Sequence, residues 1–153
     1  MPTPVKKTQT NMIHIIEKSK TAIATTLLVL TLFTSCNKKD DLEEIFTDKE
    51  WKLAFIENET GRNSPEKQYT LKFEKASFTF STPSQATISG NWYADGKSRD
   101  FGCSNITTTG RISGDEVAKE ALNILRNAHT YEGDANYLKI KSTNNNYMQF
   151  HNK

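Results

Sequence analysis

The sequence lacks the short patterns from which an enzymatic activity could be inferred. It contains no G-x-S-x-G, G-x-G-x-x-G or P-loop motif, so the common serine-hydrolase and nucleotide sites are not indicated. Cysteine occurs only at Cys36 and Cys103, and histidine occurs three times. The two histidines of the later chain, His129 and His151, stand far apart and in no metal-binding spacing. We therefore expect no catalytic residue, no cofactor and no metal site.

Long apolar runs are also scarce, and the one that is present lies near the start of the chain. Residues 22–34 carry no charge, and four lysines precede them against a single Glu17. A basic segment followed by roughly 7–15 apolar residues is typical of a secretory signal peptide. The run is shorter than the roughly 20 residues that a spanning helix needs. We expect residues 1–35 to be a signal peptide.

The end of this run, Leu32-Phe33-Thr34-Ser35-Cys36, resembles the lipobox of bacterial lipoproteins. In that family the signal is cut before the cysteine, which then carries acyl chains. Phe33 departs from the pattern, because a smaller aliphatic residue is usual three places before the cysteine. Each buried methylene contributes about 0.8 kcal/mol, so acyl chains on Cys36 would hold a domain on a membrane without a spanning helix. The alternative is an ordinary signal peptide that leaves Cys36 as a free thiol.

The residues after Cys36 are strongly charged, and we expect 36–47 to form a charged, lipid-anchored tether. Its Lys38, Lys39, Asp40 and Asp41 resemble the export signal that sends some Gram-negative lipoproteins to the outer face of the membrane. The predicted location is the outer membrane, either at the cell surface or facing the periplasm. A solvated linker without targeting information is the alternative for the same charges.

Removal of residues 1–35 changes the charge balance. The full chain has 20 Lys and Arg against 18 Asp and Glu, and the signal peptide holds four of the former and one of the latter. The remaining 118 residues carry a formal charge of −1, which excludes the basic footprint of a nucleic-acid binder. With Cys36 acylated, Cys103 has no disulfide partner and is expected to be a small buried side chain.

Alternation of apolar and polar residues predicts that the later chain is mostly strands. Strands are expected at 50–57, 68–74, 77–80, 85–94, 98–109, 136–142 and 147–151, with a loop at 131–134. A capping box at Ser113 and Glu116 predicts one helix that ends near residues 127–129. The fold class is therefore mainly β (α+β), a curved or barrel-like antiparallel sheet with one late helix packed on it.

The strand pattern also predicts which side chains lie inside. Trp51, Leu53 and Phe55 alternate and should share the inner face of the first strand, and Gly90 is expected to mark a bulge. The expected core is Trp51, Phe73, Phe80, Trp92, Leu122, Leu125 and Phe150.

The order of these segments resembles the META domain, a fold of small bacterial envelope proteins and heat-shock-associated lipoproteins. The carriers of the resemblance are Trp51-Lys-Leu53, Tyr69-Thr-Leu-Lys-Phe73, Ser89-Gly-Asn-Trp-Tyr93, Ser104-Asn-Ile-Thr-Thr-Thr109, Tyr137-Leu-Lys-Ile140 and Met148-Gln-Phe150. The chain departs from that family at Ser81-Thr-Pro-Ser84, where a Gly-Cys-Asn segment is usual, and at Glu50, where a glycine is usual. Lipocalin-like small lipoproteins are a second resemblance, since they also open on a tryptophan strand and place a helix late.

The resemblance implies a single domain over residues 48–153 and transfers no catalytic residue. The predicted function is that of a non-enzymatic, lipid-anchored envelope protein that serves in maintenance, stress response or protein interaction. The alternative is a lipocalin-like barrel that binds a small apolar ligand. For that alternative, Trp92 and Tyr93 beside Gly90 are the candidate ligand groove. The expected partners are the membrane, through Cys36, and a protein or small apolar ligand that the sequence does not identify.

Overall fold

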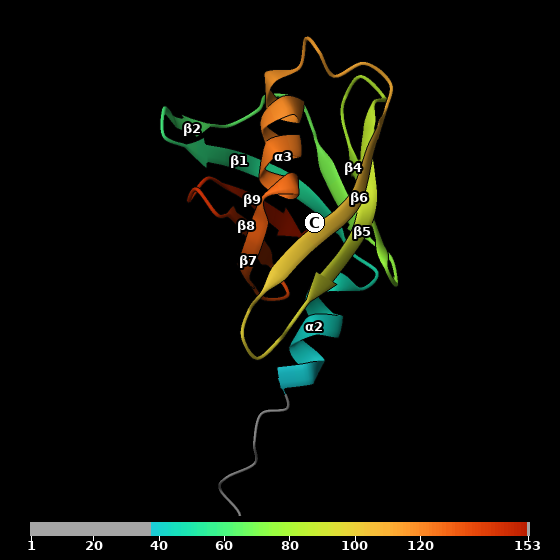
Figure 1. Cartoon of the computed structure of the whole chain (residues 1–153), viewed down its shortest axis with the longest axis vertical. Coiled ribbons are helices and arrows are strands. Elements are labelled where there is room, and N and C mark those ends of the chain that lie inside the picture. The colour runs from blue at the N-terminus through green and yellow to red at the C-terminus, as the bar shows by residue number, and fades with distance from the viewer. Residues whose placement is uncertain (1–37, 153) are drawn as a thin grey trace, which may run out of the picture. The chain divides into compact units, whose positions relative to one another are not determined.

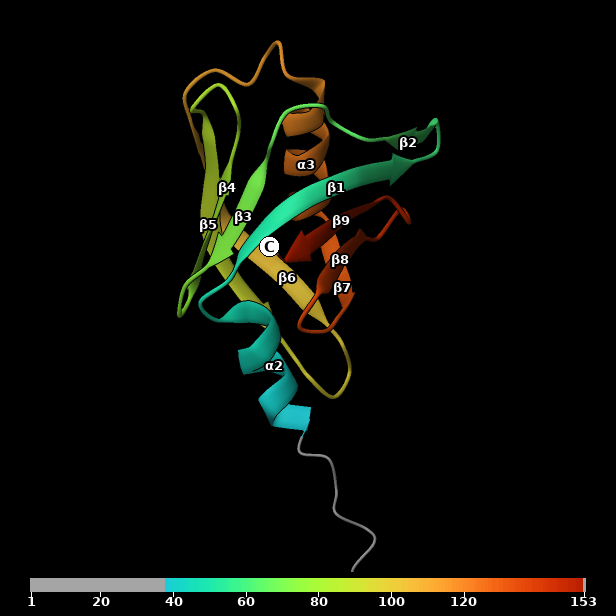
Figure 2. The same ribbon diagram turned by 180° about the vertical axis from the view of Figure 1, so that it is seen from behind.

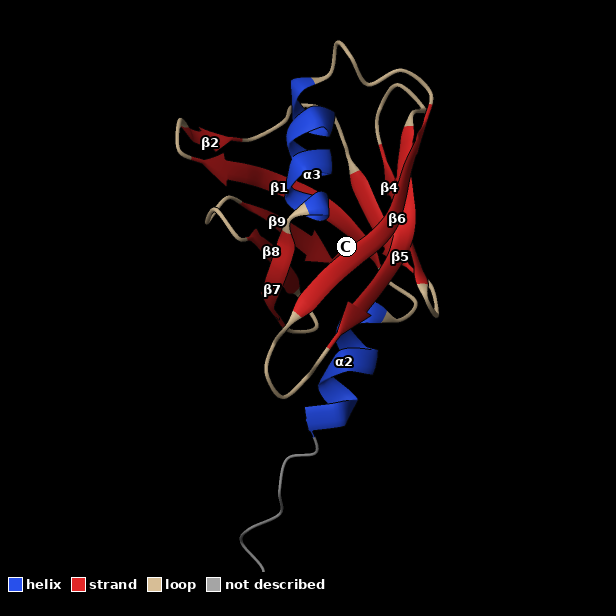
Figure 3. Cartoon of the chain, in the orientation of Figure 1, coloured by secondary structure: helices blue, strands red, loops and turns tan. Residues whose placement is uncertain are grey.

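The computed structural model describes residues 38–152, which form one sheet and two helices (Figures 1 and 3). The elements in chain order are α2 (Lys38–Phe46), β1 (Glu50–Asn58), β2 (Gly61–Asn63), β3 (Thr70–Phe73), β4 (Ser77–Ser81), β5 (Thr87–Ala94), β6 (Phe101–Thr109), α3 (Glu116–Arg126), β7 (Ala128–Gly133), β8 (Tyr137–Ser142) and β9 (Tyr147–Asn152).

The nine strands form one antiparallel sheet that curls into a nearly closed barrel. The strand order is β6-β5-β4-β3-β1-β9-β8-β7, with the short β2 paired to β1. The two ends of this order meet at the bridge between Asp100 and Thr130 and at the hydrogen bond that Tyr131 N donates to Arg99 O. Helix α3 packs beside this seam, against β6 and β8 (Figure 1). The predicted fold class, a barrel-like antiparallel sheet with one late helix on it, is confirmed.

The N-cap residue of helix α3 lies two residues later than the Ser113 that the sequence pattern predicts. Asp115 is the N-cap residue, and its side chain accepts a hydrogen bond from Ala118 N at 2.9 Å. The predicted capping box of Ser113 and Glu116 is therefore wrong, because Asp115 is an equally good cap and lies closer to the helix. The buried face of α3 consists of Ala118, Ala121, Ile124 and Leu125.

The interior of the barrel is filled by large side chains. Of the predicted core, Trp51, Phe73, Phe80, Leu125 and Phe150 are buried, whereas Trp92 and Leu122 are only partly buried. Burial of each such side chain contributes roughly 1.5–3 kcal/mol, so the packed interior is the main source of stability.

Two bulges change which side chains face inward. A register shift between Leu53 and Phe55 turns Phe55 outward and buries Ile56, so the predicted inner position of Phe55 is wrong. The extra residue of a bulge reverses the alternation beyond it. A second shift, between Ser89 and Asn91, confirms the bulge expected at Gly90.

Helix α2 occupies most of the segment for which we expected a charged tether. Its buried residues Ile45 and Phe46 lie one helical turn beyond Leu42, which packs against the core, so the three form an apolar face. The chain from 131 to 133, expected as loop, belongs to β7, which pairs with β8 and carries the buried Tyr131. Neither helix of residues 38–152 is long and apolar enough to cross a membrane.

Candidate functional site

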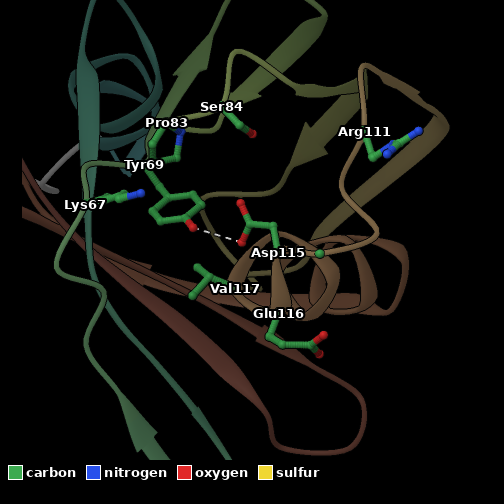
Figure 4. A pocket seen from close by; sticks show the side chains of 9 residues that line it. Lys67, Tyr69, Pro83, Ser84, Arg111, Asp115, Glu116 and Val117 are labelled. Atoms are coloured by element: carbon green, nitrogen blue, oxygen red, sulfur yellow. Dashed lines mark hydrogen bonds between the residues drawn. The ribbon is translucent and has the colours of Figure 1, made fainter.

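One hollow with polar residues in its wall lies where three loops meet the start of α3. These loops are at the end of the barrel opposite α2 (Figures 1 and 2). The hollow has a volume of about 550 Å³ and opens to solvent. Its wall is made by Lys67, Tyr69, Pro83, Ser84, Arg111, Gly114, Asp115, Glu116 and Val117 (Figure 4). We call this hollow the loop-end pocket.

A hydrogen bond between Tyr69 and Asp115 forms the floor of the loop-end pocket. The Tyr69 hydroxyl donates to Asp115 Oδ1 at 2.8 Å, and the same oxygen accepts from Ala118 N (Figure 4). Burial, followed by this hydrogen bond and the nearby carboxylate charge, raises the pKa of Tyr69 to about 12. The phenol is therefore a protonated donor over the whole physiological range, and a role as a base is excluded at neutral pH.

The loops that flank this pair are held by local contacts. In the β4–β5 loop, Thr82 Oγ1 accepts from Ala86 N at 3.1 Å and lies 2.9 Å from Ser84 Oγ. Gly110 has φ +83°, and a side chain there would meet Ala86 at 3.0 Å. Only glycine combines this backbone conformation with so close an approach. The pocket wall is thus built by defined turns.

Both signs of charge surround the loop-end pocket. Lys67 is exposed in the β2–β3 loop, and Arg111 is exposed in the β6–α3 loop. Asp115 and Glu116 lie at the start of α3. Arg111 extends away from the Tyr69–Asp115 pair (Figure 4). Both hydrogen bonds that Asp115 accepts end on Oδ1, so this one oxygen holds α3 and Tyr69 in place. The arrangement suits hydrogen bonding to a polar partner surface.

A second hollow, of about 660 Å³, lies between α2 and the turn that joins β3 to β4. We call it the α2 groove. Leu42, Phe46, Phe73 and Trp92 provide its apolar wall. Phe46 lies between aromatic rings, with centroids 4.8 Å from Trp92 and 4.9 Å from Phe73. Phe46 thus lines the groove and packs against both rings.

The structure separates the two residues predicted to share a ligand groove. Trp92 faces the α2 groove, where its Nε1 donates to Glu74 O at 2.8 Å. Tyr93 points to the outer face, is 63% exposed and covers Gly102, where an added side chain would meet the Tyr93 ring at 2.3 Å. Alternation along β5 places neighbours on opposite faces, so one groove cannot use both.

The other predicted site residues lie at or beyond the edge of the described chain. Cys36 lies outside the described residues, so its acylation stays a prediction. Lys38, Lys39, Asp40 and Asp41 belong to the first half of α2 rather than to an irregular tether. The division of the chain at residues 35 and 47 likewise stays a prediction.

The remaining candidates for chemistry do not converge. His129 and His151 are both exposed, and residues 42–152 contain no group of three or more metal-ligating side chains. Burial raises the pKa of the Cys103 thiol to about 12, so it stays protonated and a poor nucleophile. Cys103 was expected to be buried; it is partly buried and packs against the core.

The fold and its hollows define a small helix-capped β-barrel, and comparison with known proteins assigns its family. Residues 57–152 match the model of DUF4847, a domain of unknown function, and the chain belongs to that family. The resemblance to the META domain, with the lipocalin-like second choice, is therefore wrong. The residues that suggested it lie in or beside strands β1, β3, β5, β6, β8 and β9, so they indicate strands rather than a particular family.

Two solved structures are similar to this chain. The crystal structure of a DUF4847 family protein from Bacteroides vulgatus ATCC 8482 is 26% identical, with a TM-score of 0.58, and the match covers 72% of this chain and 96% of that one. The NMR structure of a protein from Burkholderia xenovorans is 13% identical, with a TM-score of 0.56 over 76% of this chain and 88% of that one, and shows the fold alone. Comparison with curated proteins gives no match.

Sequence reasoning missed the loop-end pocket. Tyr69 carried only a strand signal and Asp115 only a helix-start signal, and they stand 46 positions apart. The aspartate directly before an apolar helical run was the one local signal for the cap. Its pairing with Tyr69 depends on the curl of the barrel, which no local pattern contains.

Proposed function

We propose that the protein is a lipid-anchored protein of the bacterial cell envelope, held by acyl chains on Cys36, and that its barrel is a non-enzymatic interaction module. The anchor is supported by the lipobox-like residues 32–36 behind a basic and apolar leader. Acyl chains on Cys36 would hold the protein on the membrane without a spanning helix.

The main support for an interaction module is that the interior of the barrel is filled by side chains, whereas the polar hollow lies outside it, at the loop end. Trp51, Phe80 and Phe150 are fully buried inside, so the interior holds side chains where a lipocalin-like barrel would hold a ligand. The polar hollow is instead external, at the loop-end pocket around Tyr69 and Asp115. This favours contact with a protein surface over enclosure of a small molecule.

Substitution of the anchor residue tests the proposal. The variant Cys36→Ala should move from the membrane fraction to the soluble fraction after cell lysis, and it should no longer incorporate a clickable palmitate analogue. The matched control is Cys103→Ala, which removes the other thiol and should leave both readouts unchanged. Retention of Cys36→Ala in the membrane fraction would show that the lipid anchor is not at this residue.

The proposed location is the outer membrane, with the charged residues 38–41 directing the protein to the cell surface. Replacement of Lys39, Asp40 and Asp41 by neutral residues should protect the domain from protease added to intact cells. Cleavage that persists after the replacement would show that these charges do not direct the protein to the surface. Absence of cleavage in the parent would show that the domain faces the periplasm.

The α2 groove favours a second candidate function, the binding of a small apolar ligand. Its wall contains the partly buried Trp92, whose fluorescence would respond to an occupant. Titration with 1-anilinonaphthalene-8-sulfonate should quench the tryptophan fluorescence of the parent more strongly than that of Trp92→Phe, which keeps only the buried Trp51. Equal affinity of the probe for both proteins would show that it does not bind in the α2 groove.

A further inference from the structure

The last turn of α2 is part of the hydrophobic core. Ile45 and Phe46 are 1% and 2% exposed, and the Phe46 ring lies 4.8–5.7 Å from four other aromatic rings. The indole Nε1 of Trp51 donates a buried hydrogen bond to Ile45 O at 3.0 Å. This bond also satisfies a carbonyl that the end of a helix would otherwise leave unpaired. α2 is therefore fixed to the barrel at its C-terminal end.

The chain between the helix and the anchor residue is short. Cys36 stands two positions before Lys38, the first residue of α2, so two residues can span at most about 7 Å between them. The nine residues of α2 rise about 13 Å as a helix. The same nine residues would reach about 30 Å as extended chain. Helix formation thus replaces a long, loose tether by a short spacer whose far end is buried in the domain.

We propose that α2 is a rigid spacer that holds the α2 end of the barrel next to the surface of a lipid bilayer and directs the loop-end pocket away from it. This inference rests on the proposed anchoring through Cys36. It adds an orientation to that proposal: the β3–β4 turn and the α2 groove face the membrane, and the loops around Tyr69 and Asp115 face the aqueous side, where a protein partner would approach.

The charges around the α2 groove agree with a spacer rather than with adhesion of the barrel to lipid. The exposed residues there are mostly acidic: Glu43, Asp48 and Glu74, against Lys75. Anionic headgroups repel such a surface, and the repulsion acts over about a Debye length, which is about 8 Å at physiological ionic strength. A helix of about 13 Å keeps the acidic end outside most of that range.

Energy transfer from each end of the barrel to a labelled bilayer tests the orientation. The full acylated chain is purified from membranes and reconstituted into phosphatidylcholine–phosphatidylglycerol vesicles that carry a rhodamine headgroup acceptor. In a Cys103→Ala background, a donor dye is attached at Lys75→Cys, beside α2, or at Arg111→Cys, at the loop-end pocket. Both substitutions remove one exposed lysine or arginine charge, so the pair is matched.

The expected result is energy transfer at least about twofold more efficient from position 75 than from position 111. A ten-residue Gly/Ser insertion between residues 37 and 38 leaves α2 docked and adds a flexible tether of about 17 Å. With this insertion, transfer from position 75 should fall and the difference between the two positions should shrink.

Two failures of this experiment have different meanings. Equal transfer from positions 75 and 111 in the parent, on protein that floats with the vesicles, would overturn the orientation and leave the lipid anchor intact. Protein that does not float with the vesicles, and whose Cys36 reacts with a maleimide dye, would overturn the anchor and the orientation together.

Discussion

The hydroxyl of Tyr69 and the backbone N–H of Ala118 share one acceptor, Oδ1 of Asp115, at 2.8 and 2.9 Å. One carboxylate oxygen thereby caps α3 and ties it to the start of β3, 46 positions earlier in the chain. The start of the helix, the chain before β3 and the floor of the loop-end pocket are therefore coupled through a single side chain.

Removal of either partner should show this coupling. Tyr69→Phe is expected to lower the free energy of unfolding by about 1–3 kcal/mol, because it removes a hydrogen bond to a charged group. Asp115→Ala should cost about 1 kcal/mol for the lost cap and more for the Tyr69 hydroxyl left unpaired. In urea denaturation, a double-mutant cycle should give a coupling energy of at least about 0.5 kcal/mol.

Ser113→Ala is the matched control for that cycle, because Ser113 lies two residues before the cap and is exposed. It should change stability by less than about 0.5 kcal/mol. Strict additivity of Tyr69→Phe and Asp115→Ala would show that the shared oxygen does not couple the two elements.

Stability should fall at alkaline pH. Burial raises the pKa of Tyr69 from 10.0 and that of Cys103 from 9.0, each to about 12. Where the folded state keeps a proton that the unfolded chain has released, the unfolded state gains stability as pH rises. The contribution of both groups is thus complete below about pH 9 and is lost progressively up to about pH 12. Denaturation midpoints measured between pH 8 and 11 should fall.

The comparison that isolates these two groups is with the double variant Tyr69→Phe, Cys103→Ala. Its denaturation midpoint should decline less steeply between pH 9 and 11 than that of the parent. Parallel pH profiles for the two proteins would assign the alkaline loss to other groups.

Because α2 is attached to the barrel through Phe46, a substitution at this residue should strongly reduce the stability of the fold. Phe46→Ala should lower the free energy of unfolding by about 3–5 kcal/mol, because the ring is 2% exposed and packed against Phe73, Trp92, Phe101 and Tyr131. The exposed Glu44→Ala in the same helix should change it by less than about 0.5 kcal/mol. Equal stabilities of the two variants would mean that α2 is not docked in solution.

The bulge at Gly90 predicts a contrast between two glycines. A side chain at Gly90 would lie 2.6 Å from the backbone oxygen of Ser104, so Gly90→Ala should destabilise the barrel by about 1–3 kcal/mol. Nothing lies within 4 Å of a side chain at Gly114, where alanine should be tolerated. Thermal unfolding of both variants measures the difference, and a fully stable Gly90→Ala would show that the β5–β6 bulge can relax.

The strands were predictable because most of them keep a strict two-residue period. β3, β4, β8 and β9 each have one buried and one solvated face, and the sequence pattern recovers them to within two or three residues. β1 departs from this period. Its bulge next to Ala54 shifts the period, so Phe55 was assigned to the wrong face.

Segments whose structure depends on distant contacts were not predictable. The composition of residues 38–44 is that of a solvated linker. The helix there is held by the contacts of Phe46 with rings from β3, β5, β6 and β7 and by the hydrogen bond from Trp51 to Ile45 O. Part of β7 was predicted as loop because Tyr131 is the one buried residue of this strand, so the strand shows no alternating pattern. The loop-end pocket joins loops from three parts of the chain, so only the closed barrel reveals it.

Mass spectrometry of the intact protein, extracted from the membranes of its own host, tests whether Cys36 carries the proposed acyl chains. We expect a chain that begins at Cys36 and whose mass exceeds that of residues 36–153 by a diacylglyceryl group and an amide-linked acyl chain. A mature chain that begins at another residue and carries an unmodified Cys36 thiol would contradict it.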